Sequence, residues 1–410
     1  MTDGFRRRYL SIAGLVVSLW LLTAPASAAL SVVNVRDCGA VGNGVVDDTG
    51  AIAKAVALAK ERGLPVLIPR GKYVVTKTIV LDDQSVTGSA SGAWCADTDS
   101  LPVIVDRNAS GPCFEMRAGA SLHGLTIDAA YPQDAASGPP AVLIAGIGVY
   151  ISDLRINGGY DGIDSDGIHN TGRTNIQNVF MANIQHVGVR FAGALDVPRL
   201  EAVEVWDASN SKAAMSSGVG FLLGRNDGMR MTDCFAFAEH TAYLFQATGG
   251  STETAGNFWG SLNGCSCDFC VNGVDIEGDH TVSISGGFFW CHETALTVNG
   301  GDATVELTGC LLKSNGNPCI QARASGSLVV SGCRLSRPMK EHPGPAVVLT
   351  GGSTTLNGNY IDAYGDGVDV DATVVSADIG ANTILAHGAR GIVTQAGANV
   401  LQAGNLISTQ

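Results

Sequence analysis

The chain has 410 residues and a formal net charge of −13, with 15% charged and 6% aromatic residues. It contains no run rich in lysine or arginine, and clustered positive charge is what attracts nucleic-acid phosphates, so we expect no nucleic-acid partner. Glycine is abundant, with 53 residues. Such a composition predicts many short strands packed through small and branched side chains rather than helices.

Residues 1–28 are predicted to be an export signal. Arg6, Arg7 and Arg8 give a basic start, Leu10 to Leu22 an apolar stretch, and Ala26-Ser27-Ala28 a cleavage site. The apolar stretch is short for a membrane span and no second one follows. The arginines also fit a twin-arginine signal, the alternative to general secretion. Both routes predict a soluble, secreted or periplasmic protein without a membrane partner after cleavage.

One short sequence motif recurs along the second half of the chain. Its copies are 281–289, 304–312, 327–335, 354–361, 377–384 and 400–407. They share a turn position, occupied by Gly286, Gly309, Gly332, Gly358, Ala381 and Gly404, with steps of 23, 23, 26, 23 and 23 residues by subtraction. Weaker copies precede them at 150–156, 175–181, 199–205, 229–237 and 258–267. A fixed period of this length predicts a solenoid.

A second sequence motif, offset within each period, is a small residue followed by residues that alternate between inward-facing and outward-facing. Its copies are 167–170, 188–191, 273–276, 295–298, 346–349 and 367–370. Several strands per period without a helical pattern between them predict a parallel β-helix, whose neighbouring strands lie about 4.8 Å apart. We expect an all-β fold, a right-handed parallel β-helix with an N-terminal capping helix.

The eleven cysteines are not interpreted as a disulfide framework, because their count is odd and four share one repeat position. Cys234, Cys265, Cys310 and Cys333 hold that position, which becomes Asn359, Asn382 and Asn405 in the last coils. We expect buried thiols in the former and a hydrogen-bonded asparagine ladder in the latter. Cys95 and Cys113 are a candidate pair, and Cys265, Cys267 and Cys270 a weak metal candidate without a second ligand pair.

The segment before the coils has its own character. Asp47 or Asp48 is placed to cap a helix whose apolar side is Ile52, Val56 and Ala59 and which ends at Gly63. Residues 37–44, 47–49 and 69–73 resemble the opening signature of the pectate-lyase-like superfamily, with Cys38 and Asn43 departing from the usual aromatic and aspartate. The resemblance implies a helix covering the N-terminal end of a β-helix. We divide the chain into 1–28 (signal), 29–120 (cap and first coils) and 121–410 (coils).

Polar residues gather where the coils are longest. Steps of 24, 31 and 31 residues separate Asn178, Ala202, Asp233 and Gly264 by subtraction, which predicts loops near 207–217 and 249–256 that wall a groove. Beside them we select the catalytic candidates Asp164, Asp166, His169, His186, Arg190 and Glu239. We expect Ile168 and Val189 to point inward, His169 and Arg190 to be outward neighbours, and Asp166 and His186 to share a turn position.

These residue types fit two kinds of sugar chemistry. Hydrolysis needs two carboxyl groups, for which Asp166 with Asp164 or Glu239 is a candidate set. Lyase or epimerase chemistry on a uronic acid needs a base and a cation for the substrate carboxylate, for which His169 or His186 with Arg190 is a candidate set. The segment 166–168 resembles part of a polygalacturonase motif, but that family's further motifs and the alginate-epimerase motif are absent. Taken singly, each residue also fits a turn-stabilising role.

We therefore predict a secreted enzyme that cleaves or modifies an acidic polysaccharide, as a lyase or a glycoside hydrolase. The alternatives are a uronan C5-epimerase, a non-catalytic carbohydrate-binding protein and an exopolysaccharide-processing protein. An aromatic ladder would favour binding, but Trp206, Trp259 and Trp290 show no common register in the sequence. The sequence specifies no cofactor; a weak calcium site is an alternative to a solvated surface at Asp366, Asp369 and Asp371.

Overall fold

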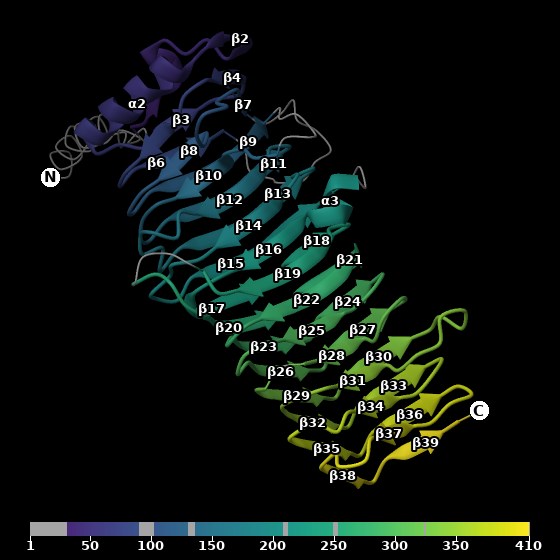
Figure 1. Ribbon diagram of the computed structural model, residues 1–410. Coiled ribbons are helices and arrows are strands. Elements are labelled where there is room, and N and C mark those ends of the chain that lie inside the picture. Colours follow the sequence, from purple (N-terminus) through teal and green to yellow (C-terminus); the bar gives the residue numbers. More distant parts are fainter. Residues whose placement is uncertain are drawn as a thin grey trace, which may run out of the picture.

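The computed structural model describes residues 31–89, 102–129, 136–207, 212–248, 253–323 and 325–409. Figure 1 shows one elongated stack of coils with the helix α2 at its N-terminal end, which confirms the predicted right-handed parallel β-helix. The predicted signal and Cys95 lie outside the described residues. Among those that are described, no helix combines the length and apolarity that crossing a membrane requires.

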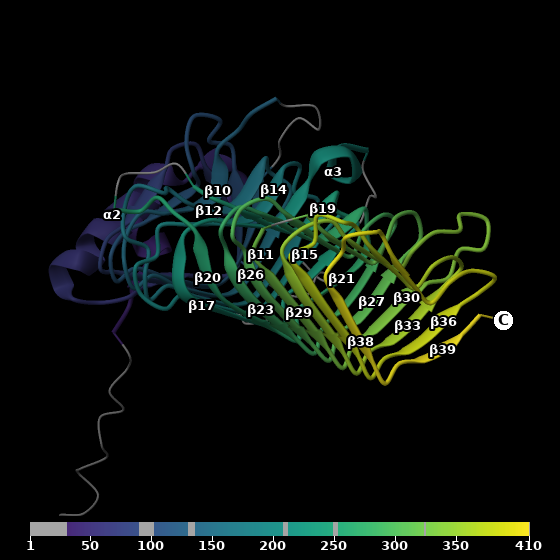
Figure 2. The same cartoon turned by 60° about the horizontal axis from the view of Figure 1, so that its bottom comes forward.

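A regular coil consists of three short strands, and each pairs in parallel with its counterpart in the next coil (Figures 1 and 2). We call these the first column, the second column and sheet B. The first column comprises β9 (Ser121–Ala129), β11 (Tyr150–Asn157), β13 (Asn175–Ala182), β15 (Arg199–Trp206), β17 (Asn226–Thr232), β20 (Phe258–Asn263), β23 (Thr281–Ser285), β26 (Thr304–Thr308), β29 (Ser327–Ser331), β32 (Ser353–Asn357), β35 (Ser376–Gly380) and β38 (Val400–Ala403).

The second column shares one hydrogen-bonded sheet with the first. It comprises β18 (Phe235–Phe237), β21 (Ser266–Cys270), β24 (Phe288–Cys291), β27 (Leu311–Ser314), β30 (Arg334–Arg337), β33 (Tyr360–Ala363), β36 (Thr383–Ala386) and β39 (Leu406–Ser408). In the early coils, long strands such as β15 run through both columns, since β15 pairs with both β17 and β18.

Sheet B is a separate sheet of thirteen strands in chain order. It comprises β5 (Ile79–Leu81), β8 (Phe114–Met116), β10 (Pro140–Ile144), β12 (Asp161–Ser165), β14 (Val187–Phe191), β16 (Val219–Leu223), β19 (Thr241–Gln246), β22 (Asn272–Glu277), β25 (Leu296–Asn299), β28 (Ile320–Ala322), β31 (Val347–Leu349), β34 (Val368–Val370) and β37 (Ile392–Thr394). The short helix α3 (Lys212–Ser217) precedes β16.

The N-terminal end is covered as the sequence predicts. Helix α2 (Thr49–Arg62) ends at Gly63 in the left-handed conformation and buries Ile52, Val56 and Ala59. The Asp47 carboxylate accepts a hydrogen bond from the Thr49 N–H at 2.9 Å. The remaining elements of this end are β1 (Val33–Asn34), the 3-10 helix Val35–Cys38, β2 (Asn43–Asp47), β3 (Val66–Ile68), β4 (Lys72–Val75), β6 (Ser85–Gly88) and β7 (Val103–Asp106).

The predicted turn position joins the first and second columns. All six of its residues have positive φ, with Ala381 at 53° and Gly286 at 68°, a conformation that glycine adopts without the steric cost paid by other residues. Asp153, Asn178, Ala202 and Asp233 have φ between 50° and 54° and continue the ladder into the long coils. The repeat read from the sequence is therefore the backbone repeat of the helix.

In four coils the residue that follows this turn is a cysteine, and its side chain is buried. Cys234, Cys265, Cys310 and Cys333 are free and buried, as expected, and Cys113 is also free. In the last coils the amide side chains form the predicted ladder. Asn359 N donates to Asn382 Oδ1 at 2.9 Å, and Asn382 N donates to Asn405 Oδ1 at 3.0 Å.

The asparagine ladder predicts that replacing Asn382 lowers the stability of the protein. Its side chain also donates to Leu356 O and accepts from Asn359 Nδ2, and the residue is 1% exposed. Asn382→Ala leaves these buried groups without partners, so we expect urea denaturation to show a loss of about 3 kcal/mol in the free energy of unfolding. Asn382→Cys, which copies the residue of Cys333, should lose less. Equal stability of Asn382→Ala and the wild type would contradict this role.

Candidate active site

The candidate site lies on β12 and β14, two adjacent strands of sheet B. Ile163 and Val189 pair in register and are both fully buried, so the next residues, Asp164 and Arg190, pair side by side on the outer surface. Arg190 Nη1 donates to Asp164 Oδ2 at 3.1 Å. The coil stacking thus places a carboxyl group and a guanidinium in contact, 26 residues apart in the sequence.

The predicted pairing of His169 with Arg190 is wrong. The tripeptide Asp-Gly-Ile occurs at 161–163 and at 166–168, and both copies satisfy the in-out pattern. The structure uses the first copy as the strand, while Ile168 lies in the following turn and is 64% exposed. The outward neighbour of Arg190 is therefore Asp164.

The expected match between Asp166 and His186 is also wrong. His186 lies before β14, whereas Asp166 follows β12, so they lie at opposite ends of neighbouring parallel strands. Asp166 Oδ1 accepts hydrogen bonds from the backbone N–H groups of Ile168 and His169, each at 2.9 Å, and its other oxygen contacts His169 Nδ1. This aspartate organises its own turn, and His169 extends from it with 61% of its side chain exposed.

Asp161 completes the cluster. Its Oδ1 accepts from His186 Nδ1 at 2.8 Å and from Val187 N at 2.9 Å, while its Oδ2 lies 3.6 Å from Arg190 Nη2. The side chains of Asp161 and Asp164 are 5% and 9% exposed, against 37% for His186 and 33% for Arg190. Two buried carboxyl groups thus lie behind two accessible cationic or titratable side chains.

The electrostatics distinguish Asp164 from its neighbours. Burial raises its pKa to about 7, with a further increase from Asp161 and an opposing decrease from Arg190 and His186. Its Oδ1 is buried and has no hydrogen-bond partner within the described structure. A buried carboxyl group in contact with an arginine and tuned to neutral pH is typical of functional sites.

Glu239 does not join this cluster. It precedes β19, the second strand after β14 in sheet B, and is 2% exposed. Burial, reinforced by the charge of Asp207, raises the pKa of Glu239 to about 8. Glu239 therefore lies on another coil, apart from Asp164, His186 and Arg190.

The two predicted insertions flank the cluster. One joins β15 to β16, contains α3, and lies at the N-terminal ends of the sheet B strands, on the side of His186 (Figure 1). The other joins β19 to β20 and lies at their C-terminal ends, where Thr254 Oγ1 donates to Gly167 O at 2.6 Å. Arg225 Nη1 holds the same loop through Glu253 O at 2.7 Å.

A second copy of the Asp-Gly-x-Asp motif, at residues 366–369, shows which features of residues 161–164 are structural. Asp366 begins this copy and accepts from Arg390 N at 2.8 Å, as Asp161 accepts from Val187 N. Capping the next coil is therefore a structural role of the corner aspartate. Asp369 occupies the same outward row as Asp164 and is only half-buried, with a pKa raised by burial but no arginine in hydrogen-bond contact within the described coils.

Asp161 is not among the catalytic candidates selected from the sequence. The signal that identifies it is the motif Asp-Gly-x-Asp itself, together with the 26-residue step from Gly162 to Gly188 by subtraction. No group of three or more His, Cys, Asp or Glu within the described ranges is arranged to hold a metal ion. Cys265, Cys267 and Cys270 and the aspartates near Asp369 therefore form no such group.

Comparisons with known proteins agree with this architecture. A family profile described as rhamnogalacturonase A/epimerase, pectate lyase-like, matches residues 32–93. No curated protein matches the sequence significantly. Three solved structures show how widely the fold is shared.

The A-module of mannuronan C-5 epimerase AlgE6 from Azotobacter vinelandii has a TM-score of 0.58 and 15% identity, covering 92% of this chain and 99% of that module. The pre-mature gene product 12 of bacteriophage phi29 has a TM-score of 0.60 and 12% identity, covering 97% of this chain and 59% of that one. The surface adhesin PfbA of Streptococcus pneumoniae has a TM-score of 0.53 and 12% identity, covering 92% of both chains. The structural likeness shows that this chain has the right-handed parallel β-helix fold of pectate-lyase-like proteins, and the profile match is confined to its N-terminal residues 32–93.

Proposed function

We propose that this protein is a secreted or periplasmic enzyme that abstracts a proton from a uronic acid residue of an acidic polysaccharide. The observation that carries the proposal is the contact between Asp164, whose pKa is raised to about 7, and the accessible Arg190. Proton abstraction next to a carboxylate requires a base and a cation that neutralises the developing charge. Asp164 and Arg190 supply this pair.

Each residue takes one role in the reaction. Arg190 binds the uronate carboxylate and stabilises the enolate that forms when Asp164 removes the proton on C5. In a lyase, the electron pair then forms the C4=C5 double bond as the C4–O bond breaks, and the leaving oxygen takes a proton. In an epimerase, C5 takes a proton on its opposite face instead. His186, held by Asp161 at 2.8 Å, is the proton donor in either outcome.

Hydrolysis fits the cluster less well. It needs two accessible carboxyl groups on opposite sides of the glycosidic bond. Asp161 is buried and occupied by His186 and Val187, Asp166 is occupied by its own turn, and Glu239 is buried on another coil. Asp164 is itself largely buried, and no second carboxyl group of this set is free to act with it.

The comparisons support the same class of substrate. One structure of similar fold carries the name of an epimerase that acts at C5 of mannuronan, and the N-terminal family profile carries the words rhamnogalacturonase and epimerase. At 15% identity the structural likeness shows the fold alone. The choice between lyase and epimerase therefore rests on the product formed.

The activity prediction uses a panel of polygalacturonate, alginate and neutral polysaccharides. Unsaturated products are followed by ultraviolet absorbance, chain cleavage by reducing ends and epimerisation by NMR. We expect Asp164→Asn and Arg190→Ala each to lower kcat/KM by at least about a hundredfold. Asp369→Asn, the same change in the same outward row, should retain wild-type activity. Reducing ends without unsaturated products would instead establish hydrolysis and refute proton abstraction at C5.

The pKa of Asp164 predicts the pH dependence of this activity. A base must be deprotonated, so kcat/KM should rise as the pH increases through about 7. Because the charge of Arg190 lowers this pKa, Arg190→Gln should move the rise to higher pH in its residual activity, whereas Arg190→Lys should move it less. A profile that falls through this range would show that Asp164 acts in its protonated form.

The same group predicts how stability depends on pH. The folded pKa of Asp164, about 7, lies above its ordinary value of 3.8. Its contribution to the free energy of unfolding is therefore full below the ordinary value and is lost as pH rises through about 7. We expect Asp164→Asn to gain stability relative to wild type between about pH 4 and pH 8, as measured by urea denaturation. A constant difference across that range would contradict the raised pKa.

A further inference from the structure

The second column carries an exposed aromatic surface outside sheet B. We define the belt as the outward residues Phe288, Trp290, Leu311, Lys313, Arg334 and Tyr360 on β24, β27, β30 and β33. Phe288, Trp290 and Leu311 are 45%, 38% and 56% exposed. Only 6% of the whole sequence is aromatic, so this concentration on one face marks an interaction surface.

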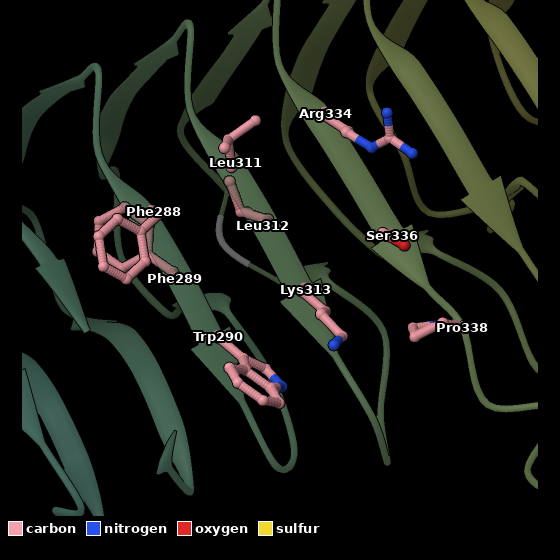
Figure 3. Close-up of a pocket in the computed structure, with 9 residues that line it drawn as sticks. All are labelled: Phe288, Phe289, Trp290, Leu311, Leu312, Lys313, Arg334, Ser336 and Pro338. Carbon is pink, nitrogen blue, oxygen red and sulfur yellow. The ribbon is translucent and has the colours of Figure 1, made fainter. Parts of the chain in front are cut away.

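The belt is arranged in two parallel rows across the coils. Phe288, Leu311 and Arg334 pair in register along one row, and Trp290 pairs with Lys313 in the other (Figure 3). A hollow of about 420 Å³ lies between them and is also lined by Ser336 and Pro338. The row of Phe288 continues toward the N-terminal coils through Phe235 on β18, whose ring centroid lies 6.1 Å from that of Phe288.

Positive charge accompanies the rings. Lys313 Nζ lies 4.1 Å from the centroid of Trp290, and Arg334 Cζ lies 4.7 Å from that of Tyr360. None of the nine residues lining the hollow carries a carboxylate, although the chain has a net charge of −13. The six belt residues thus carry two positive charges and no negative one, although Asp362 follows Ser336 in the row of Trp290 and Lys313. The charge of the belt residues is complementary to an anionic ligand.

The chemistry of the belt matches a sugar acid. A pyranose ring has an apolar face that packs on an aromatic ring, and a uronate adds a carboxylate at its edge for a lysine or arginine. Rows that cross successive coils at about 4.8 Å spacing can contact successive sugars of an extended chain. A second protein copy would also bury the rings, but it would have to match an unbalanced pair of cations.

We propose that the belt is a non-catalytic binding site for a segment of uronate-containing polysaccharide. It lies in the second column, whereas Asp164 and Arg190 lie in sheet B, so it holds polymer independently of the reaction. The proposal takes only the class of polymer from the proposed function. Binding at the belt raises the local concentration of substrate for the other face.

The experiment measures uronate binding at the belt in a variant whose sheet B site is disabled. The mature protein with Asp164→Asn and Arg190→Ala is titrated calorimetrically with oligomers of polygalacturonate and of alginate, with dextran as the uncharged comparator. We expect binding to at least one uronate, and a loss of affinity of at least about tenfold on adding Trp290→Ala or Arg334→Ala. Trp290→Phe should restore most of it.

Two surface residues of the first column are matched controls. Trp259 is 60% exposed on β20, and Arg230 is exposed on β17, so Trp259→Ala and Arg230→Ala should leave affinity within about twofold. Circular dichroism melts confirm that each variant is folded. Equal losses in the controls, equal affinity for dextran, or no uronate binding would overturn the proposal.

Sedimentation velocity tests whether a second copy of the protein, rather than a polysaccharide, covers the belt. A dimer that Trp290→Ala dissociates would show that a second copy covers the belt, which would also overturn the proposal. The catalytic hypothesis is tested separately by the activity of the chain with an intact sheet B. Activity without belt binding and belt binding without activity are therefore distinguishable results.

Discussion

Every feature of this molecule depends on the parallel hydrogen-bond ladder between successive coils. Each strand pairs with the same strand of the next coil, so residues at equivalent positions stack about 4.8 Å apart. The left-handed turn at positions such as Gly286 and Ala381 fixes the direction of the second strand in each coil. A change of one residue in register would exchange the buried and outward rows, so the turn and the asparagine ladder protect the whole surface pattern.

The ladder also explains how distant residues form one site. Asp164 and Arg190 meet because β12 and β14 are stacked, not because either segment folds around the other. The same stacking repeats the corner aspartate at Asp161 and Asp366, where both accept a backbone N–H of the next coil. What differs is the surroundings: Asp164 is buried against Arg190, whereas Asp369 is only half-buried. The inserted loops beside β12 to β19 accompany this difference.

Much of the fold is predictable because its period is fixed by backbone geometry. The turn residues, the capping helix with Ile52 buried, and the ladder from Asn359 to Asn405 follow directly from the repeat. The site was predicted in composition but not in register. Two adjacent copies of Asp-Gly-Ile satisfy the same in-out pattern, and coil lengths are irregular in this region, so alternation alone cannot select the first copy.

The aromatic belt was missed for a related reason. Trp206 and Trp290 both lie in the strands that form the second column, whereas Trp259 lies in the first. Two insertions separate Trp206 from Trp290 in the sequence, and they hide this shared column from any fixed-period comparison. Only the pairing of strands reveals it.

Both the Asp164 site and the belt lower the stability of the folded chain, and this supports a functional role for each. Burying Asp164 with an unpartnered Oδ1 opposes folding, since a buried polar atom without a hydrogen bond costs about 1–3 kcal/mol. Exposing Phe288, Trp290 and Leu311 to water forgoes hydrophobic stabilisation of the folded chain. Asp275 and Asp369 in the same row also have a buried Oδ1 without a partner in the described structure. Neither arrangement is required by the coil, because other coils place Thr297 and Thr383 at equivalent positions. Local departures from the stable pattern, one electrostatic and one hydrophobic, are where a scaffold built by repetition acquires chemistry and binding.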